Sequence, residues 1–355
     1  MPSETCGVKY IGSKSSLIPS ILQCLDETIP QGSIHSVIDV FTGTTRVAQA
    51  FKARGWKVTT SDLSWASSCY SGTWIANQGS NEHLQDKIQY LNGLAGYNGW
   101  ITKNYCDVVA EKGGVVRVWQ PKNGRKADAI RDQIQTWLNE KTIEQWEADT
   151  LTTSLILALD KVDNTVGVQQ AYLKDWCTRS YNDLLLELPK VPSGPQGIHI
   201  VGNCLTLSYP QADLAYLDPP YSSHSYASYY HIWDSLAKWD KPAVGLKTNR
   251  RVDRISGHTT YDESMHSSWN TKRSALSAFE SLIDRLPVKW VLISYNNESL
   301  VEISKIEEIL EKYPLVTITE IDYKRNIMCQ IGNAAKESKE HKKENIEYLI
   351  LVQKY

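Results

Sequence analysis

The sequence lacks the marks of several classes of protein. No apolar run approaches the roughly 20 residues that a membrane-spanning helix needs, and the first residues show no apolar core of a signal peptide. The seven cysteines are odd in number and scattered, and no two form a CxxC pair. We therefore expect an intracellular protein with reduced thiols, without disulfides and without a zinc site.

An excess of charge of one sign is also missing. The 38 Lys and Arg residues nearly balance the 40 Asp and Glu residues, and the net charge is −2. This balance disfavours a highly basic protein that coats nucleic acid, although one basic face would be enough to bind phosphates. Residues 112–131 and 247–254 are locally basic, and a hairpin around Gly113-Gly114 is expected to lead into a turn at 121–124. The candidate phosphate contacts are Lys122, Arg125, Lys126, Lys247, Arg250 and Arg251. The alternative for each stretch is a solvated loop.

The most informative motif is Asp218-Pro219-Pro220-Tyr221, which follows the apolar run 214–217. Such a run predicts a buried strand, and open α/β sheets bind their ligands at the carboxyl ends of their strands. Proline has no N–H, so carbonyl oxygens and the Asp218 carboxylate dominate this edge. An edge rich in acceptors and faced by an aromatic ring suits a planar substrate with an amino group, such as a nucleobase. The alternative is a strand that simply ends in a proline turn.

A second motif has the order strand, turn, helix, strand. The expected strands are 36–41 and 56–63, with a turn at 42–45 and a helix at 46–55 between them. Asp62 ends the second strand about 20 residues beyond the turn, where such folds bind a ribose hydroxyl. The fingerprint G-x-G-x-x-G is absent, which disfavours a dinucleotide and favours a cofactor with adenosine but no pyrophosphate. The alternative for Asp39 and Asp62 is that each caps a helix.

A third motif, Lys9-Tyr10-Ile11-Gly12-Ser13-Lys14, precedes a helix expected at 17–25. In this order, the three motifs resemble the D12 class of adenine-specific DNA methyltransferases, which includes Dam-type and FokI-type enzymes. Residues 9–14 are similar to its N-terminal motif, 39–44 to its cofactor loop, Asp62-Leu63 to its ribose-binding acid, and 218–221 to its catalytic motif. Less specific similarities to the FokI-type branch extend the resemblance over nearly the whole chain. They lie at Asn123, 127–131, 163–167, 171–174, Tyr226 and 229–231.

The resemblance implies a fold, a domain organisation and partners. The fold would be a Rossmann-like α/β sheet that uses S-adenosylmethionine, with helices on both faces. Residues 1–63 and 198–355 would form the catalytic domain, and the mainly helical insertion 64–197 would recognise the target. The implied partners are double-stranded DNA and a cognate restriction endonuclease, with no metal, and the location is the cytoplasm of a prokaryotic or phage-type system. A monomer is expected because the enzyme can modify one strand per visit.

The resemblance also implies roles for individual residues. Asp218, Pro219, Pro220 and Tyr221 would form the catalytic site, with Tyr221 stacked on a flipped base. The residues expected to bind the cofactor are Tyr10, Lys14, Asp39, Phe41, Thr42, Gly43, Thr44, Asp62, Leu63, Asn203, Cys204 and Asp218. Lys9, Lys14, Tyr221 and Tyr226 are expected to contact the substrate, together with the basic residues named above.

Two positions depart from the pattern of the class. Thr45 stands where many members have a second glycine, which would tighten the approach to the methionine part of the cofactor. Asn203 stands where relatives often have an aspartate that contacts the adenine amine of the cofactor. An asparagine side-chain oxygen accepts the same hydrogen bond, so the departure does not exclude function.

Three other functions remain open at this point. The first is transfer to another amine, namely cytosine N4, an RNA adenine or a protein glutamine. Serine commonly replaces the first acid of the motif in cytosine-N4 enzymes and asparagine does so in glutamine enzymes, so Asp218 favours adenine. The second is DNA binding without catalysis, and the third is dinucleotide-dependent oxidation and reduction.

The rest of the chain alternates between helical and extended patterns. Further strands are expected at 198–201, 214–217, 290–294, 315–321 and 348–352. Further helices are expected at 127–138, 152–162, 274–285 and 300–312, and a charged, exposed loop at 336–345.

Overall fold

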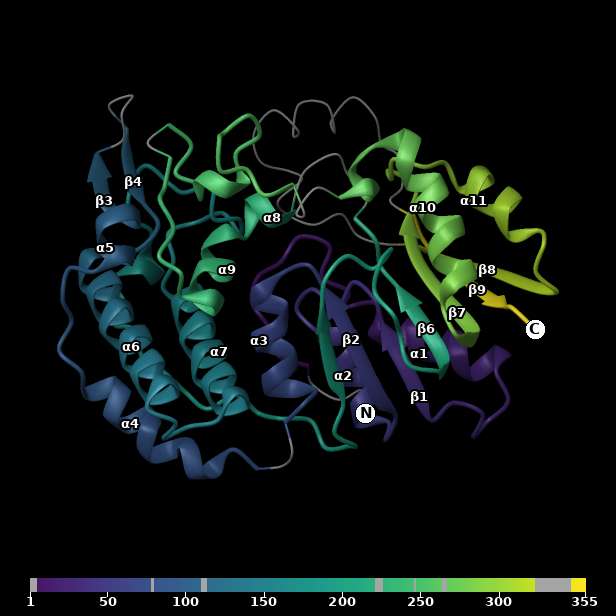
Figure 1. Ribbon diagram of the computed structural model, residues 1–355, viewed down its shortest axis with the longest axis horizontal. Coiled ribbons are helices and arrows are strands. Elements are labelled where there is room, and N and C mark those ends of the chain that lie inside the picture. The colour runs from purple at the N-terminus through teal and green to yellow at the C-terminus, as the bar shows by residue number, and fades with distance from the viewer. Residues whose placement is uncertain are drawn as a thin grey trace.

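A seven-stranded sheet in the order β5-β2-β1-β6-β7-β9-β8 forms the centre of the fold (Figure 1). The computed structural model describes residues 5–77, 80–109, 114–220, 226–245, 247–263, 267–322 and 346–355. The strands are β5 Ile198–Val201, β2 Lys57–Asp62, β1 Ser36–Asp39, β6 Ala212–Leu217, β7 Val288–Asn296, β9 Ile346–Gln353 and β8 Leu315–Asp322. The first five are parallel, whereas β9 is antiparallel to both β7 and β8. The strands expected from the sequence are therefore confirmed.

Helices cover both faces of this sheet, as expected for the fold class. Val37, Leu214 and Tyr216 pack in one apolar cluster with α1 Ile18–Thr28, α2 Arg46–Ala53 and α3 Trp65–Trp74. Alternate residues of the same strands, Ile38 and Ala215, pack in a second cluster with α10 Lys272–Arg285 and α11 Ile303–Leu310. Strands that are buried on both faces read as continuous apolar runs, which is why 214–217 is apolar throughout.

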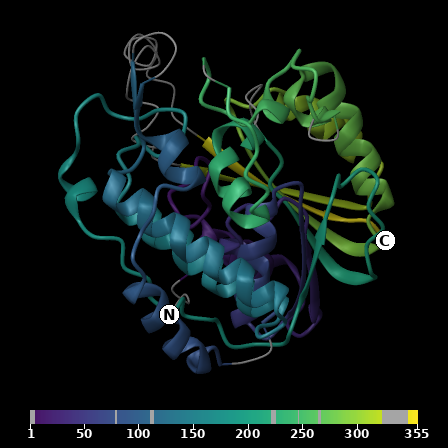
Figure 2. The ribbon, with the colours of Figure 1, turned by 60° about the vertical axis from the view of Figure 1, so that its left-hand side comes forward.

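A mainly helical part lies beside the sheet. Its elements are α4 Gln85–Gly93, α5 Trp100–Tyr105, β3 Cys106–Val109, β4 Val115–Arg117, α6 Pro121–Asn139 and α7 Gln145–Lys161. In Figures 1 and 2, α6 and α7 lie side by side and away from α10. Helix α3 joins this part to the sheet because it packs on β2 and β5 as well as on α7. The crossing of α3 and α7 is close, since a Cβ added to Gly72 would lie 2.2 Å from a carboxylate oxygen of Asp149.

The segment that begins at residue 226, after the 218–221 motif, also packs against the helical part. It consists of α8 Tyr226–Tyr229 and α9 His231–Lys238, and α9 contacts both α3 and α7. Short 3-10 helices are η1 Glu82–Leu84, η2 Thr178–Tyr181, η3 Val252–Arg254 and η5 Ser268–Asn270. No helix in the described part of the chain is long and apolar enough to cross a membrane.

The expected hairpin before residue 121 is confirmed, whereas the expected turn at 121–124 is wrong. Strands β3 and β4 pair in antiparallel fashion. Pro121 then occupies the first position of α6, where its missing N–H would have no intrahelical partner in any case. The charged loop expected at 336–345 falls outside the described residues.

Candidate active site

One cleft runs along the carboxyl edge of the parallel strands. It encloses about 1410 Å³ of space, part of it open to solvent. Its lining includes every residue expected to bind the cofactor, together with Pro219, Pro220 and Tyr226. Tyr221 lies outside the described residues.

The turn after β1 is tied to the tip of β2. Gly43 has a φ of +50°, a backbone conformation that glycine adopts without steric cost, and its N–H donates to Asp62 Oδ2 at 2.9 Å. The other carboxylate oxygen of Asp62 accepts a hydrogen bond from the N–H of Ser64 at 2.9 Å. Burial raises the pKa of Asp62 to about 6. The carboxylate is therefore held in one orientation at the wall of the cleft.

Asp39 presents a second carboxylate, at the end of β1. Its Oδ2 accepts a hydrogen bond from Thr42 Oγ1 at 2.8 Å. Its Oδ1 is buried and has no hydrogen-bond partner among the described residues. Burial raises the pKa of this carboxyl to about 7. A buried acceptor without a donor is costly, so this oxygen suits a ligand that brings an N–H or O–H group.

Asp218 follows directly after β6 and shares an ammonium group with another acid. Lys14 Nζ lies 3.2 Å from Asp218 Oδ1 and 2.8 Å from Glu347 Oε1. Burial raises the pKa of Asp218 to about 7; Lys14 opposes this rise and Glu347 adds to it. Sequence reasoning missed Glu347. For an acid in a strand near the end of the chain, the local sequence does not indicate at which edge of the sheet the side chain will lie.

Aromatic rings line the cleft on two sides. Tyr10 stacks on Tyr230 with ring centroids 4.3 Å apart, and Tyr226 lies 5.6 Å from Tyr10. The hydroxyl of Tyr230 accepts a hydrogen bond from the N–H of Ile11 at 2.7 Å, which fixes the N-terminal motif on α8 and α9. On the other side, the buried Trp269 meets Phe41 edge to face at 5.1 Å. Trp269 was not expected from the sequence, because nothing near it in the chain marks it as part of a site.

Comparison with known proteins identifies the family. Residues 10–327 match the family of D12 class N6 adenine-specific DNA methyltransferases. The chain belongs to this class. Its members modify DNA and take the methyl group from S-adenosylmethionine. The resemblance seen in the three sequence motifs is therefore confirmed.

Similar proteins include several modification enzymes. The type II methyltransferase M.NlaIII of Neisseria lactamica is 29% identical over 90% of this chain and 92% of its own length. The modification methylase StsI of Streptococcus sanguinis is 29% identical over 90% of this chain and 48% of its own length. The type II methyltransferase M.FokI of Planomicrobium okeanokoites is 27% identical over 87% and 47%, respectively. The chain thus spans nearly all of the first relative and about half of the other two.

The two departures from the D12 pattern have structural explanations. Thr45 has a φ of +59°, which favours glycine, but its side chain is buried, does not line the cleft and accepts a hydrogen bond from Gln49 Nε2 at 3.0 Å. It therefore does not narrow the cleft. Asn203 Oδ1 accepts a hydrogen bond from the N–H of Leu205 at 3.0 Å, and an amide oxygen has a second lone pair for a ligand.

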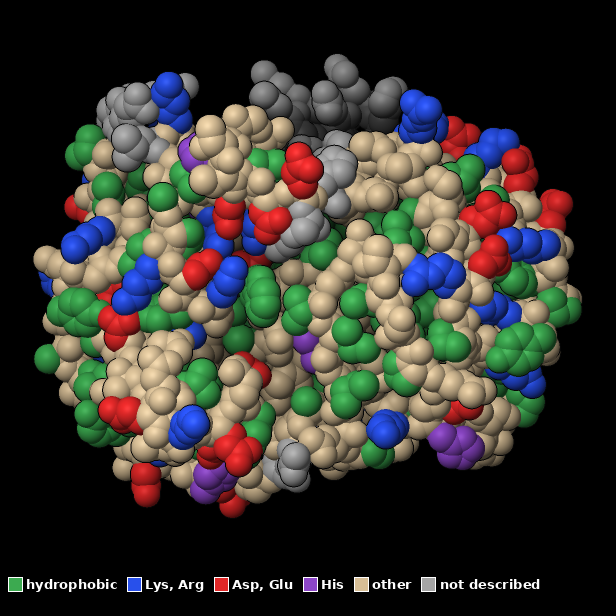
Figure 3. Space-filling model, viewed as in Figure 1, with side chains coloured by type: hydrophobic (Ala, Val, Ile, Leu, Met, Phe, Trp, Pro, Cys, Tyr) green, Lys and Arg blue, Asp and Glu red, His purple; other side chains and the backbone are tan. Residues whose placement is uncertain are grey.

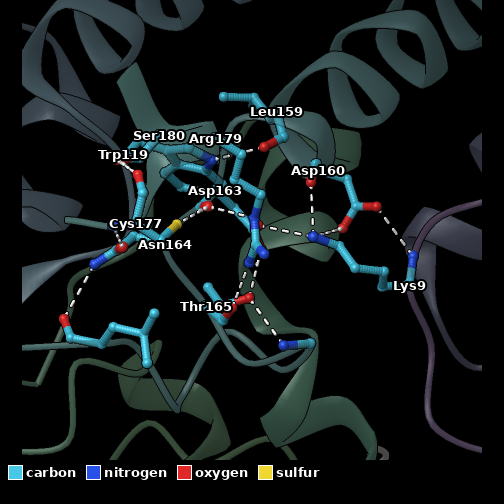
Figure 4. A network of polar contacts seen from close by, with 12 residues as sticks. Lys9, Trp119, Leu159, Asp160, Asp163, Asn164, Thr165, Cys177, Arg179 and Ser180 are labelled. Carbon is cyan, nitrogen blue, oxygen red and sulfur yellow. Dashed lines mark hydrogen bonds and ion pairs between the residues drawn. The ribbon is translucent and has the colours of Figure 1, made fainter. Parts of the chain in front are cut away.

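Lys9 lies in a polar network next to the cleft, and it does not line the cleft (Figure 4). Its Nζ is 2.8 Å from Asp163 Oδ1 and donates to the backbone oxygen of Asp160 at 2.8 Å. Asp163 also accepts hydrogen bonds from Arg179 Nε at 2.9 Å and from Thr165 Oγ1. The network joins the N-terminal motif of this D12 enzyme to the end of α7 and the loop that follows it.

The expected phosphate contacts differ in accessibility. Arg251 is 1% exposed and paired with Asp240 at 2.7 Å and Asp253 at 2.8 Å. This burial contradicts its expected contact with phosphate. Arg250 is half-buried and donates to Gln170 Oε1 at 2.8 Å, whereas Lys247 is exposed.

The other expected phosphate contacts lie on α6. Lys122 is paired with the exposed Asp183, Arg125 is exposed and Lys126 is half-buried. On the face shown in Figure 3, basic and acidic side chains are interspersed. Within the described ranges, no three His, Cys, Asp or Glu side chains are grouped to hold a metal ion.

Proposed function

We propose that this D12 enzyme methylates N6 of an adenine within a short recognition sequence of double-stranded DNA, after flipping that base into the cleft. The observation that carries the proposal is the position of Asp218 and Pro219 in the same cleft as Asp39 and Asp62. The cleft thus places acceptors for an amino group beside a set of residues suited to an adenosine-containing cofactor.

The residues fit S-adenosylmethionine. We assign the ribose hydroxyls to Asp62, whose carboxylate is already oriented by Gly43 and Ser64. The unpaired Oδ1 of Asp39 is a buried acceptor suited to the ammonium group of the methionine part. Bound cofactor would supply a methyl group on a positively charged sulfur. Asn203 supplies an amide oxygen for the adenine amine, and Phe41 and Trp269 supply apolar rings for its faces.

Asp218 and Pro219 would act on the target amine. The lone pair of adenine N6 is delocalised into the ring, so N6 is a weak nucleophile. Hydrogen bonds from the two N6 hydrogens to the Asp218 carboxylate and the Pro219 carbonyl favour a pyramidal nitrogen with a localised lone pair. These bonds strengthen as N6 gains positive charge, which is the differential stabilisation of the transition state that catalysis requires.

The base must leave the duplex to reach this edge, because a stacked base is inaccessible inside a helix. Tyr226 lines the cleft near Asp218, and Tyr221 keeps the stacking role expected from the sequence. We assign target recognition to residues 64–197. In support, Figure 1 shows the β3–β4 hairpin at the same end of the molecule as the carboxyl ends of β6 and β7. We also propose that the enzyme acts as a monomer and is paired with a restriction endonuclease, since its relatives are named modification methylases.

The test is to sequence DNA by a single-molecule method that detects modified bases. The DNA comes from cells that lack other adenine methylation and express the wild type, Asp218→Ala or the control Asp26→Ala. Asp26 is an exposed acid paired with Arg54, outside the cleft. N6-methyladenine at one short motif is expected with the wild type and Asp26→Ala but not with Asp218→Ala. Unmodified DNA in all three samples, from folded protein that binds cofactor, would refute the proposal.

A further inference from the structure

Glu347 lies on β9, which pairs with β7 in antiparallel fashion and brings this acid to the catalytic edge of the sheet. The sheet order β6-β7-β9 places β7 between the strands that carry Asp218 and Glu347. Glu347 pairs in register with Asn296, at the carboxyl end of β7. Because β9 is antiparallel to β7, its first residues lie at the edge where the parallel strands end. Two acids that are 129 positions apart in the sequence numbering therefore flank one ammonium group.

The environment of Glu347 is that of a buried charge held by specific donors. Its side chain is 3% exposed, and that of Lys14 is 6% exposed. Glu347 Oε1 accepts a hydrogen bond from Ser294 Oγ at 2.6 Å and lies 2.8 Å from Lys14 Nζ. A carboxylate is rarely buried to this extent without a partner, and here both partners hold the same oxygen. Glu347 does not line the cleft, so it would act through Lys14.

The charges of Lys14 and Glu347 affect how strongly the Asp218 carboxylate accepts hydrogen bonds. A lone Lys14 would direct its full positive charge at the Asp218 carboxylate and weaken that carboxylate as an acceptor. Glu347 lies closer to the ammonium than Asp218 does, at 2.8 Å against 3.2 Å, and offsets part of that charge. We propose that Glu347 is a positioning residue, which anchors Lys14 and keeps Asp218 a strong acceptor for the amine of the target base. The inference rests on the function proposed for Asp218.

The same arrangement predicts how the activity depends on pH. Among the described residues, the titratable groups that face Asp218 are Lys14, Glu347, Asp39, Tyr216 and Tyr226. Both tyrosines stay neutral over the pH range in which Asp218 titrates, because burial raises the pKa of each phenol above its usual value. Glu347 raises the pKa of Asp218. Loss of its charge should therefore move the acidic limb of the rate profile to lower pH.

The decisive variant is Glu347→Gln, which keeps the size of the side chain and removes its charge. Single-turnover methylation of unmethylated genomic DNA is measured from pH 5.5 to 9, together with cofactor affinity by calorimetry. We expect a rate loss of roughly 10- to 100-fold at high pH, the size of effect that a small misplacement of a catalytic group produces. The acidic limb should move down by about one unit, with cofactor affinity unchanged. Glu320→Gln, an exposed change of the same kind on β8, is the control and should match the wild type.

Two further variants separate positioning from folding. Glu347→Asp keeps the charge and should retain more of the rate, with the acidic limb of the wild type. In a Lys14→Met background, Glu347→Gln should add little, because both changes remove the same interaction. An unchanged rate and limb in Glu347→Gln would overturn the inference, as would a rate loss of equal size at every pH and in both backgrounds. Absence of methylation by the wild type would instead refute the proposed function.

Discussion

The backbone N–H of Gly43 donates to the carboxylate of Asp62 at 2.9 Å, which joins the turn after β1 to the tip of β2. Asp62 thereby has two tasks. It orders the turn, and it presents its remaining lone pairs to the cleft. Asp218, at the end of β6, has no such part in the turn. Replacement of Asp62 and replacement of Asp218 should therefore impair different properties of the enzyme.

Replacement of Asp62 by Ala should weaken cofactor binding before it affects anything else. The variant loses the ribose acceptor and the partner of the Gly43 N–H. We expect the affinity for S-adenosylmethionine to fall roughly 10- to 100-fold, or about 1.4–2.8 kcal/mol. Asp218→Ala should keep near-normal affinity and lose nearly all methyl transfer. Calorimetry with the cofactor on both variants checks this, and a reversal of the two effects would contradict the assignment.

Methyl transfer should rise with pH through about 7. Burial raises the pKa of Asp218 from its usual value to about 7, so the group is protonated below that pH and ionised above it. A protonated carboxyl has lost much of its strength as an acceptor for the N6 hydrogens. Single-turnover rates at saturating cofactor should therefore show an acidic limb near pH 7. A rate that is flat between pH 5.5 and 8 would exclude ionised Asp218 from the step.

Cofactor affinity should fall towards acid pH in two limbs, an upper one from Asp39, whose pKa burial raises to about 7, and a lower one from Asp62. Burial raises the pKa of Asp62 to about 6, so binding that needs the ionised carboxylate should weaken as pH falls below about 6. Calorimetric titrations between pH 5 and 8 would show this limb. Its disappearance in Asp62→Asn, where the group no longer titrates, is the matched control.

The Lys9 network in Figure 4 should affect stability more than DNA binding. Lys9→Met removes one donor from Asp163, which keeps Arg179 and Thr165, so we expect a loss of about 1 kcal/mol of unfolding free energy. Asp163→Ala removes the acceptor of all three and should cost about 2–3 kcal/mol. Urea unfolding measures both. If Lys9→Met instead lowered the salt slope of DNA binding by about one, Lys9 would be a phosphate contact after all.

Arg251 and Lys247 are close in sequence and should behave in opposite ways. Arg251 is buried between Asp240 and Asp253, and Arg251→Ala leaves these acids only the longer ion pairs with Lys238 at 3.6 Å and Arg254 at 3.5 Å. We expect a loss of about 3 kcal/mol of stability or more. Lys247→Ala, at an exposed position, should leave stability nearly unchanged and reduce the salt slope of DNA binding by about one. Thermal unfolding and DNA titrations at several salt concentrations distinguish the two.

Much of the cleft could be predicted because its parts are local in sequence. A turn that leads into a helix, an acid at the tip of a strand and a proline-rich strand end each lie within a few consecutive residues. The parallel sheet then places these ends together at one edge. Thus Asp39, Asp62 and Asp218 were all expected at the site, and all three line it.

The residues that sequence reasoning missed or misplaced depend on contacts between distant segments. Arg251 has the same local pattern of charge as an exposed arginine, and only its packing against Asp240 shows that it is buried. Trp269 reaches the cleft through a short 3-10 helix that packs over Phe41. The expected turn at 121–124 is a helix start, because proline and glycine fit both structures and the packing of α6 on α5 and α7 selects one of them.

The sequence by itself determined the class of enzyme, the order of the strands in the chain and the acids at their ends. These depend on side-chain type and short spacing, which are properties of the chain alone. Only the tertiary structure decided that Lys14 lies between Asp218 and Glu347, and that Lys9 is paired with Asp163. Those pairings depend on the direction and register of β9 and on the path of the chain after α7. The placement of β9 and the path of the chain after α7 are determined by the burial of whole faces of the sheet and helices, and no local sequence pattern encodes that burial.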